Sequence, residues 1–402
     1  MKKNIHILLI DKITPVLSEP FKGLFILLPI YIALSILLWG GVWSGYIQLP
    51  IQNILVWHIY EMMFGAVSAG MIGFILTFIP EIYEDSTTIS KTKVLGIISL
   101  WVIGRITFWM IDVLGVYFVA ITNIALLVWI IVLVAKPLIL DPQRRHLSLA
   151  IVFIAIVIIQ AWFFASIVGW ADADALSILK VALGGFMILE LLALRRIATG
   201  TINEWLEYND IDDIFIAKPP RYNIAILCVI LFTLIEFLFP NNPTLAWIGL
   251  AVFASTLNIL NDFFITSRII IFKAYVFPLF LIIFCMSLGY GLMGYDYLDN
   301  GFYGMNHFRH FLTSGVLGLS LFMVMVIIGT IHTGRHLISN KWINIAVALI
   351  IIATLLRSTI PFFPTFIVEE NLSLIYLSSS VIWATAFIIY LIVFFPILSI
   401  QK

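Results

Sequence analysis

Imidazole side chains are concentrated in two apolar segments of this sequence. His58 lies near the start of one segment, and His307, His310 and His332 lie in or beside another. Ionisable groups are costly inside membrane segments and are usually functional there. Imidazole suits haem iron or copper rather than magnesium or calcium. These four histidines are therefore the first candidates for a metal site.

Helix geometry divides the histidines between two sites. If both segments cross a membrane in the same direction, His58 and His310 lie at about the same depth, where one ligand could bind both. His332 follows His310 by 22 residues, which is roughly 33 Å along a helix, so it belongs to the other end. His307 has a chelating spacing to His310, although a position at the water boundary would also explain it.

Each of the two histidines at similar depth begins a stripe of small residues at helical spacing. Small residues allow close packing of membrane helices, and they would also make room for a flat macrocycle whose iron the histidines ligate. With a histidine at the head of both stripes, we favour the cofactor, with the Met62 thioether as a further ligand. The stripes are His58, Met62, Gly65, Ala69 and Gly73, and His310, Ser314 and Gly318.

Charged residues inside apolar segments form a second group of candidates. Glu61 is three residues from His58, close enough to orient a ligand or to relay a proton. Arg105, Arg357 and Glu236 lie inside other segments, where a buried charge needs a partner. Haem propionates, Glu61 or an internal ion pair could fill that role. Hydrogen bonding between helices is the plain structural alternative.

The run from His332 to His336 includes Arg335, which could bind an anion or anchor the helix at lipid headgroups. The sequence contains no HExxH, phosphate-binding loop, GxSxG or CxxCH pattern, so any haem would be held without covalent bonds. The cysteines Cys228 and Cys285 have neither a disulfide framework nor the spacing of a thiolate metal site.

The composition identifies an integral membrane protein. Hydrophobic residues make up 62% of the 402 positions, charged residues make up 11%, and the mean hydropathy is +1.11. A soluble domain carries about a quarter charged residues. The net charge is zero, and no basic block suggests nucleic acid as a partner. The predicted environment is a lipid bilayer.

Hydropathy predicts an all-α bundle of about twelve transmembrane helices in a single polytopic domain, residues 1–402. Most of the 22 Lys and Arg residues fall at one side, with Arg309 toward the other, so both termini are predicted to be cytoplasmic. Residues 1–20 form a short cytoplasmic segment, and residues 195–221 form a cytoplasmic interfacial loop. The spans are 21–43, 53–79, 94–111, 115–135, 147–169, 175–194, 222–239, 245–264, 269–290, 307–331, 342–360 and 372–400.

Several runs resemble the NnrS family of bacterial membrane proteins. They are residues 57–65 (WHIYEMMFG), residues 73–77 with Pro80, residues 310–313 (HFLT) and residues 332–335 (HTGR). The resemblance implies a multi-pass protein of the bacterial inner (cytoplasmic) membrane that acts in the nitric-oxide response. It also implies noncovalent haem b, with copper as a further candidate. Phe186 and Ile327 stand where family members usually carry a basic residue.

Our interpretation is a haem-binding, alternatively copper-binding, protein of nitric-oxide tolerance. The metal would lie between the second and tenth spans near the outer face, accessible to a small diatomic ligand such as nitric oxide. Whether the protein turns over a substrate stays open. A secondary transporter that uses Glu61, Arg105 and Glu236 is the alternative. The candidate metal or haem ligands are His58, His310, His332, Met62 and His307, and the candidate charge partners are Glu61, Arg105, Arg335 and Arg357.

Overall fold

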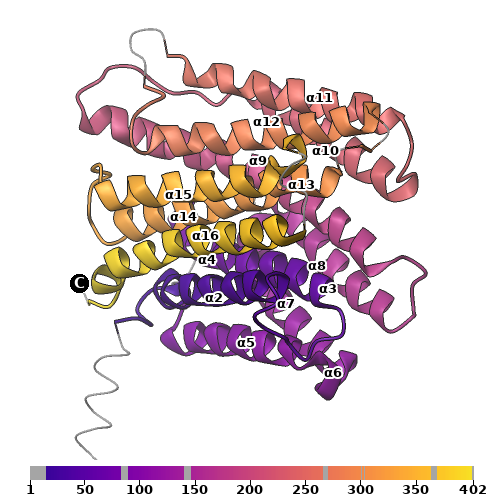
Figure 1. The fold of residues 1–402 in the computed structure, drawn as a ribbon. Coiled ribbons are helices and arrows are strands. Elements are labelled where there is room, and N and C mark those ends of the chain that lie inside the picture. The colour runs from indigo at the N-terminus through magenta and orange to yellow at the C-terminus, as the bar shows by residue number, and fades with distance from the viewer. Residues whose placement is uncertain are drawn as a thin grey trace, which may run out of the picture.

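The computed structural model of the chain describes residues 15–82, 89–139, 146–265, 270–299, 301–302, 304–363 and 369–400. Within these residues every regular element is a helix, and twelve helices are long and apolar enough to cross a membrane (Figure 1). The predicted all-α membrane bundle is therefore confirmed.

The first six spans run from α2 to α9. They are α2 (Pro20–Trp43); the combination of α3 (Ile54–Tyr60), η1 (Glu61–Val67) and α4 (Ser68–Ile82); α5 (Lys91–Trp109); α7 (Val116–Ile139); α8 (Leu147–Ile167); and α9 (Ala175–Tyr208). A single turn, α6 (Ile111–Leu114), joins α5 to α7.

The last six spans run from α10 to α16. They are α10 (Pro219–Leu238); α11 (Thr244–Ile259) with η2 (Leu260–Phe263); α12 (Val276–Leu298); the combination of α13 (Met305–His310), η3 (Phe311–Leu317) and α14 (Gly318–Ile331); α15 (Lys341–Ser358); and α16 (Glu369–Leu398). A short turn, η4 (Ile360–Phe362), follows α15.

Local sequence signals explain where several helices begin. The side chains of Asn53, Ser90 and Asp174 each accept a hydrogen bond from a backbone N–H in the first turn, which satisfies a donor that lacks a partner within the helix. Pro20 and Pro219 occupy the first turns of α2 and α10, where a missing N–H does no harm.

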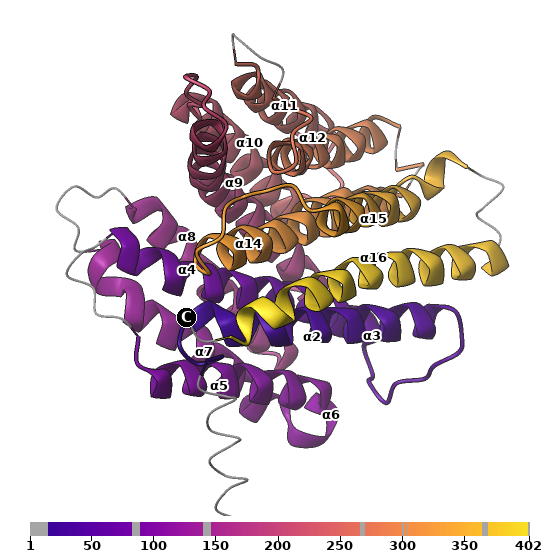
Figure 2. The ribbon, with the colours of Figure 1, turned by 90° about the vertical axis from the view of Figure 1, so that its left-hand side faces the viewer.

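The first and last spans lie side by side, as Figures 1 and 2 both show. Lys22 Nζ donates to the Ile400 carbonyl oxygen at 3.4 Å, so the two described ends of the chain meet at one face of the bundle. We call this side the terminal face and the other side the opposite face. Helices α14 to α16 lie between the group α9–α12 and the group α2–α7 (Figures 1 and 2).

The predicted end of the sixth span at Leu194 is wrong. Helix α9 continues through Tyr208, so the first half of the predicted loop 195–221 is helical. Gly200 is the one weak helix former in this stretch, and a single glycine is tolerated. After Tyr208 the chain folds back, and the Asn203 side chain bonds both the N–H and the carbonyl of Phe215, at 2.7 and 3.1 Å.

The two spans that carry the candidate histidines are the most enclosed. In Ile54–Phe78 and Met305–Ile331, 78% and 83% of the most apolar stretch is buried, against at most 61% in the other ten candidate spans of the described chain. Helices surrounded by protein rather than lipid can carry polar side chains at lower cost. The fold therefore places the histidine-bearing spans at its centre.

Backbone contact between α11 and α12 generates a stability prediction. A Cβ added at Gly249 would lie 2.9 Å from Gly294 Cα and 3.0 Å from the Tyr290 carbonyl oxygen, whereas one at Gly200 would meet nothing within 4 Å. Because backbone atoms cannot rotate away, Gly249→Ala should lower the free energy of unfolding by about 1–3 kcal/mol. Gly200→Ala, the matched control, should not lower it. Thermal unfolding in detergent measures both, and equal effects would contradict the prediction.

Candidate functional site

A π-helical segment follows the candidate histidine in each central span. His58 lies in α3, three residues before η1 begins, and His310 is the last residue of α13, directly before η3. A π-helix widens the backbone by one residue per turn and is found mostly at functional sites. Neither π segment was predicted from the sequence, because the spacing of apolar residues is almost the same in an α-helix and in a π-helix.

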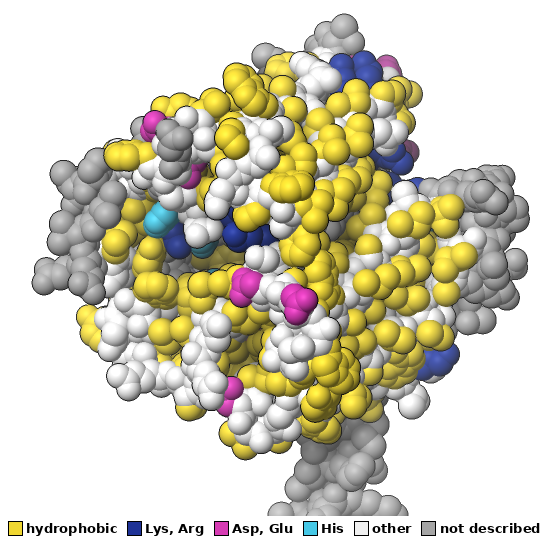
Figure 3. Space-filling view, turned by 90° about the vertical axis from the view of Figure 1, so that its right-hand side faces the viewer, with side chains coloured by type: hydrophobic (Ala, Val, Ile, Leu, Met, Phe, Trp, Pro, Cys, Tyr) yellow, Lys and Arg dark blue, Asp and Glu magenta, His cyan; other side chains and the backbone are white. Residues whose placement is uncertain are grey.

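The histidines of the two spans converge at the opposite face. A series of ring contacts leads from His58 to Arg357, which donates to His307, and His310 lies one turn after His307 in the same helix. We call these four residues the imidazole cluster. Figure 3 shows histidine side chains beside basic side chains in a hollow of the surface on this side of the molecule. His58 and His310 therefore lie on the same side of the bundle, and a ligand shared by both stays a prediction.

His310 is oriented as metal-ligating histidines usually are. Its Nδ1 lies 2.9 Å from the carbonyl oxygen of Asn306, one turn earlier. A carbonyl oxygen can only accept, so Nδ1 carries the proton and donates it. The lone pair of the neutral ring then lies on Nε2, and the backbone bond holds the ring direction. His310 thus has one nitrogen available for a metal.

His307 has a different role in the cluster. Arg357 Nη1 lies 2.8 Å from His307 Nδ1, and because a guanidinium has no acceptor, His307 must accept. The lone pair of Nδ1 is used, and Nε2 carries the proton in the neutral ring. The Arg357 guanidinium also lies over the Tyr376 ring, 4.4 Å from its centroid. In this arrangement His307 positions Arg357 and has no free lone pair for a metal.

His58 is fixed by stacking rather than by a hydrogen bond. Its ring lies parallel to Trp39, with 4.0 Å between the centroids and 2° between the planes. Trp39 in turn meets Trp43 edge-on, and Trp43 meets Tyr376. His58 Nδ1 is buried without a hydrogen-bond partner among the described residues. Imidazole lone pairs lie in the ring plane, so the stack with Trp39 holds His58 in place without using a nitrogen lone pair.

These observations fit a metal held by two imidazoles better than one held by a larger protein ligand set. In the described part of the chain, no three His, Cys, Asp or Glu side chains come together as metal ligands. Haem iron needs only two axial ligands from the protein, whereas a copper site would need a further donor. Met62, half-buried in η1, lies in the right span to supply one.

Beneath the cluster, Glu61 and Arg105 form a buried ion pair. Tyr31 donates to the Glu61 carboxylate, and Trp109 Nε1 donates to the Tyr31 hydroxyl at 3.0 Å. Arg105 also donates to the Asn123 side chain. The structure thus selects Glu61 from the partners predicted for Arg105. The roles of Tyr31 and Asn123 were missed, because nothing in a single sequence marks an uncharged residue as the neighbour of a distant ion pair.

Gly65 makes room for this ion pair on the surface of η1. A Cβ at this position would lie 2.5 Å from Glu61 Oε2 and 2.6 Å from Arg105 Nη1. Trp101 Nε1 donates to the Gly65 carbonyl at 2.9 Å, which connects α5 to the π segment a second time. The predicted small-residue stripe therefore serves ion-pair packing at Gly65.

A second buried ion pair joins α10 to α13. Arg309 donates to both carboxylate oxygens of Glu236. Arg309 is therefore a structural partner inside the protein rather than a charge of the outer surface. Glu61, Arg105 and Glu236, the residues assigned to the transporter alternative, are divided between two separate ion pairs.

The HTGR run ends helix α14 at the terminal face. Gly334 has a φ of 69°, a left-handed conformation that glycine adopts easily. The Arg335 N–H donates to the Thr330 carbonyl at 3.1 Å, the long bond of a helix C-terminal cap. His332 caps the helix beside Phe21, with 5.7 Å between ring centroids. His332 and Arg335 thus lie far from the imidazole cluster, as the helix arithmetic predicts.

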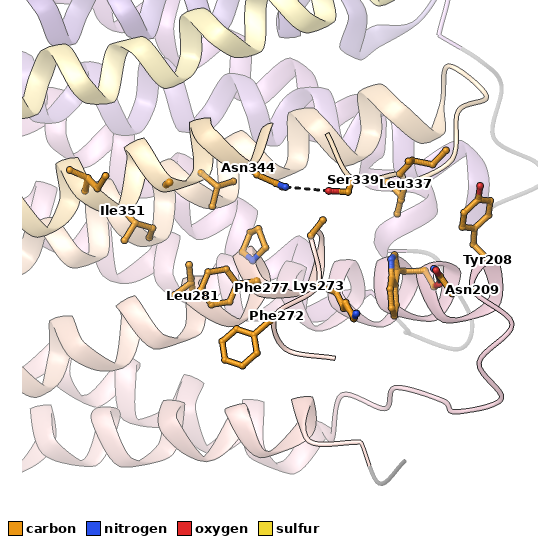
Figure 4. Close-up of a pocket in the computed structure, with 17 residues that line it drawn as sticks. Tyr208, Asn209, Phe272, Lys273, Phe277, Leu281, Leu337, Ser339, Asn344 and Ile351 are labelled. Atoms are coloured by element: carbon orange, nitrogen blue, oxygen red, sulfur yellow. Dashed lines mark hydrogen bonds between the residues drawn. The ribbon is translucent and has the colours of Figure 1, made fainter. Parts of the chain in front are cut away.

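A large cavity of the described chain lies away from the histidines. It has a volume of about 800 Å³ and opens between α12 and α15 near the terminal face (Figure 4). Its lining is mostly apolar, with Phe277 and Leu281 on one side and Ile351 on the other, and Lys273 is its one charged residue. It contains none of the predicted site residues, so the candidate site rests on donor chemistry and not on cavity size.

Comparison with known proteins gives one result for the family. The family model described as NnrS protein matches residues 15–402. No curated protein matches the chain. Phe186 and Ile327 are both buried, and the Phe186 ring meets the Phe64 ring at a centroid distance of 5.6 Å.

The Glu61–Arg105 ion pair generates a second stability prediction. Glu61→Gln leaves the Arg105 guanidinium buried without a counter-charge, so it should lower the free energy of unfolding by about 3–5 kcal/mol. Replacing both residues, Glu61→Gln with Arg105→Gln, removes the uncompensated charge and should recover part of the loss. Chemical denaturation in detergent micelles measures each variant.

The matched control is Glu207→Gln on the exposed end of α9, which should leave stability unchanged. A double variant no more stable than the Glu61→Gln single variant would mean that the charge pairing is not what stabilises this region.

Proposed function

Since the chain belongs to the NnrS family, we propose that it is a haem-binding protein of the bacterial inner membrane that acts in nitric-oxide tolerance. The observation that carries the proposal is the convergence of His58 and His310 from two separate central spans, each followed by a π segment. Two orienting contacts, the Trp39 stack and the Asn306 bond, support it further.

In this proposal the chain's own residues hold and orient the cofactor. His58 and His310 would hold the iron, and Arg357, which donates to His307 beside them, would be available to pair with a propionate. Glu61 and Arg105 hold η1 in place and so position His58. Haem iron would supply redox chemistry, and it would bind a diatomic ligand such as nitric oxide only where that ligand displaced one of the two imidazoles. The two imidazoles together with Met62 would also suit copper.

We further propose that the terminal face lies in the cytoplasm. Most of the Lys and Arg residues in the described part of the chain lie in segments at this face, and positive residues are retained on the cytoplasmic side. The imidazole cluster would then lie near the outer surface of the inner membrane, where a dissolved gas reaches it from either the lipid or the periplasm.

Absorption spectroscopy can distinguish the proposed iron ligands, His58 and His310, from His307, which accepts a hydrogen bond from Arg357. The intact protein, purified from cells supplied with haem, should show a Soret band. His58→Ala or His310→Ala should remove or shift the band, because each deletes an axial ligand. His307→Ala and His332→Ala should retain it, because the first residue accepts from Arg357 and the second lies at the terminal face.

Haem content measured as the pyridine complex checks that a lost band reflects lost cofactor. Wild-type protein without a Soret band would refute the haem proposal. If the His307→Ala variant lacked haem and the His310→Ala variant retained it, His307 and not His310 would be the iron ligand.

A further inference from the structure

Three of the glutamates in the membrane spans hydrogen-bond to a side chain of another helix, and one of these three lacks a cationic partner in the described part of the chain. Glu61 is paired with Arg105, and Glu236 is paired with Arg309. The remaining carboxyl, Glu190 on α9, has no cationic partner among the described residues. Its Oε1 instead accepts a hydrogen bond from Ser320 Oγ on α14, at 2.6 Å.

Glu190 lines a cavity of about 60 Å³ between α4, α9 and α14. Around it are Met71 and Phe74 from α4, Phe186 from α9 and Leu321 from α14, and Ser320 is the other polar side chain of the lining. No other titratable residue of the described chain lines this cavity.

Such surroundings favour the neutral carboxyl. An isolated carboxylate in an apolar cavity loses its hydration, and a hydroxyl alone does not replace a counter-charge. A protonated carboxyl carries no net charge, and it can still share its hydrogen bond with Ser320. Glu61 and Glu236, in contrast, are each stabilised as anions by a guanidinium.

A second, smaller cavity extends this space toward the terminal face. It has a volume of about 10 Å³ and shares Phe74, Leu149 and Ala193 with the first. Its remaining lining includes His146 and Arg196, whose side chains lie 3.5 Å apart. One water molecule needs about 10–15 Å³ of such space. The smaller cavity therefore has room for about one water, and the larger has room for a few.

From this arrangement we propose that Glu190 is a proton-binding site inside the membrane, which exchanges its proton with the terminal face through these two cavities. The step is a reversible transfer: a proton from water forms the O–H bond of the carboxyl, and its loss regenerates the carboxylate. The site is separate from the imidazole cluster, and the inference does not depend on the proposed haem.

A membrane-soluble carbodiimide tests the protonation state. Dicyclohexylcarbodiimide reacts with protonated carboxyls in apolar surroundings: the acid O–H adds across one C=N bond, the oxygen bonds to carbon, the proton goes to nitrogen, and no group leaves. At neutral pH the full-length protein should carry this adduct on Glu190, located by peptide mass spectrometry. Glu61 and Glu236, in the same molecule, are the built-in controls and should carry none.

Glu190→Gln supplies the matched variant. It should lose the adduct and the infrared band of a protonated carboxyl, and it should fold with wild-type stability, because an amide resembles a neutral carboxyl in size and charge. An adduct on Glu61 or Glu236 with none on Glu190 would overturn the proposal. So would identical carboxyl infrared bands in the wild type and in Glu190→Gln.

A bulky side chain placed in the two cavities tests whether the proton passes through them. Ala193 lines both cavities, so Ala193→Phe should slow the shift of the Glu190 carboxyl band when the protein is moved into deuterated buffer, by about tenfold or more if water passes there. Ala193→Leu is the milder variant if Ala193→Phe does not fold. Ala251→Phe, on the exposed surface of α11, is the control. An exchange rate unchanged by either substitution at Ala193 would refute the route.

Discussion

The ion pair between Glu61 and Arg105 is the interaction on which the centre of this bundle depends. A lone charge at this depth would be destabilising by several kcal/mol, so each residue needs the other. The pair fits against the helix only because Gly65 has no side chain, and it holds α5 against the π segment that follows His58. The geometry of the candidate ligand is thus determined by electrostatics one turn below it.

Hydropathy was sufficient to predict the twelve spans, because the length and composition of a membrane helix are imposed by the bilayer itself. The regular rise of a helix was likewise sufficient to place His58 and His310 at one depth and His332 at the other end. Both arguments use only distance along a single helix. The boundary of α9 was missed because a polar, charged sequence can continue a helix beyond the membrane as easily as end it.

Relations between helices could not be predicted in the same way. Arg105 had several possible partners, and only the packing of α5 against η1 selects Glu61. The sequence placed Arg309 toward the outer side, and only the packing of α13 against α10 shows that it pairs with Glu236. The different roles of His307 and His310 also depend on α15, which brings Arg357 to the Nδ1 atom of His307, whereas His310 donates within its own helix. A single sequence carries no signal for any of these choices.

Glu61, Glu236 and Glu190 differ in the side chain that faces each carboxyl group, and this partner determines whether the glutamate can exchange a proton. A guanidinium pairs with Glu61 and another pairs with Glu236, and a proton binding to either carboxylate would leave an arginine without its counter-charge. Glu190 is opposed by a hydroxyl and a cavity, so its charge can change without leaving another charge uncompensated. The same side chain therefore stabilises the bundle where an arginine faces it, and can exchange a proton where the neighbouring helix offers only a serine.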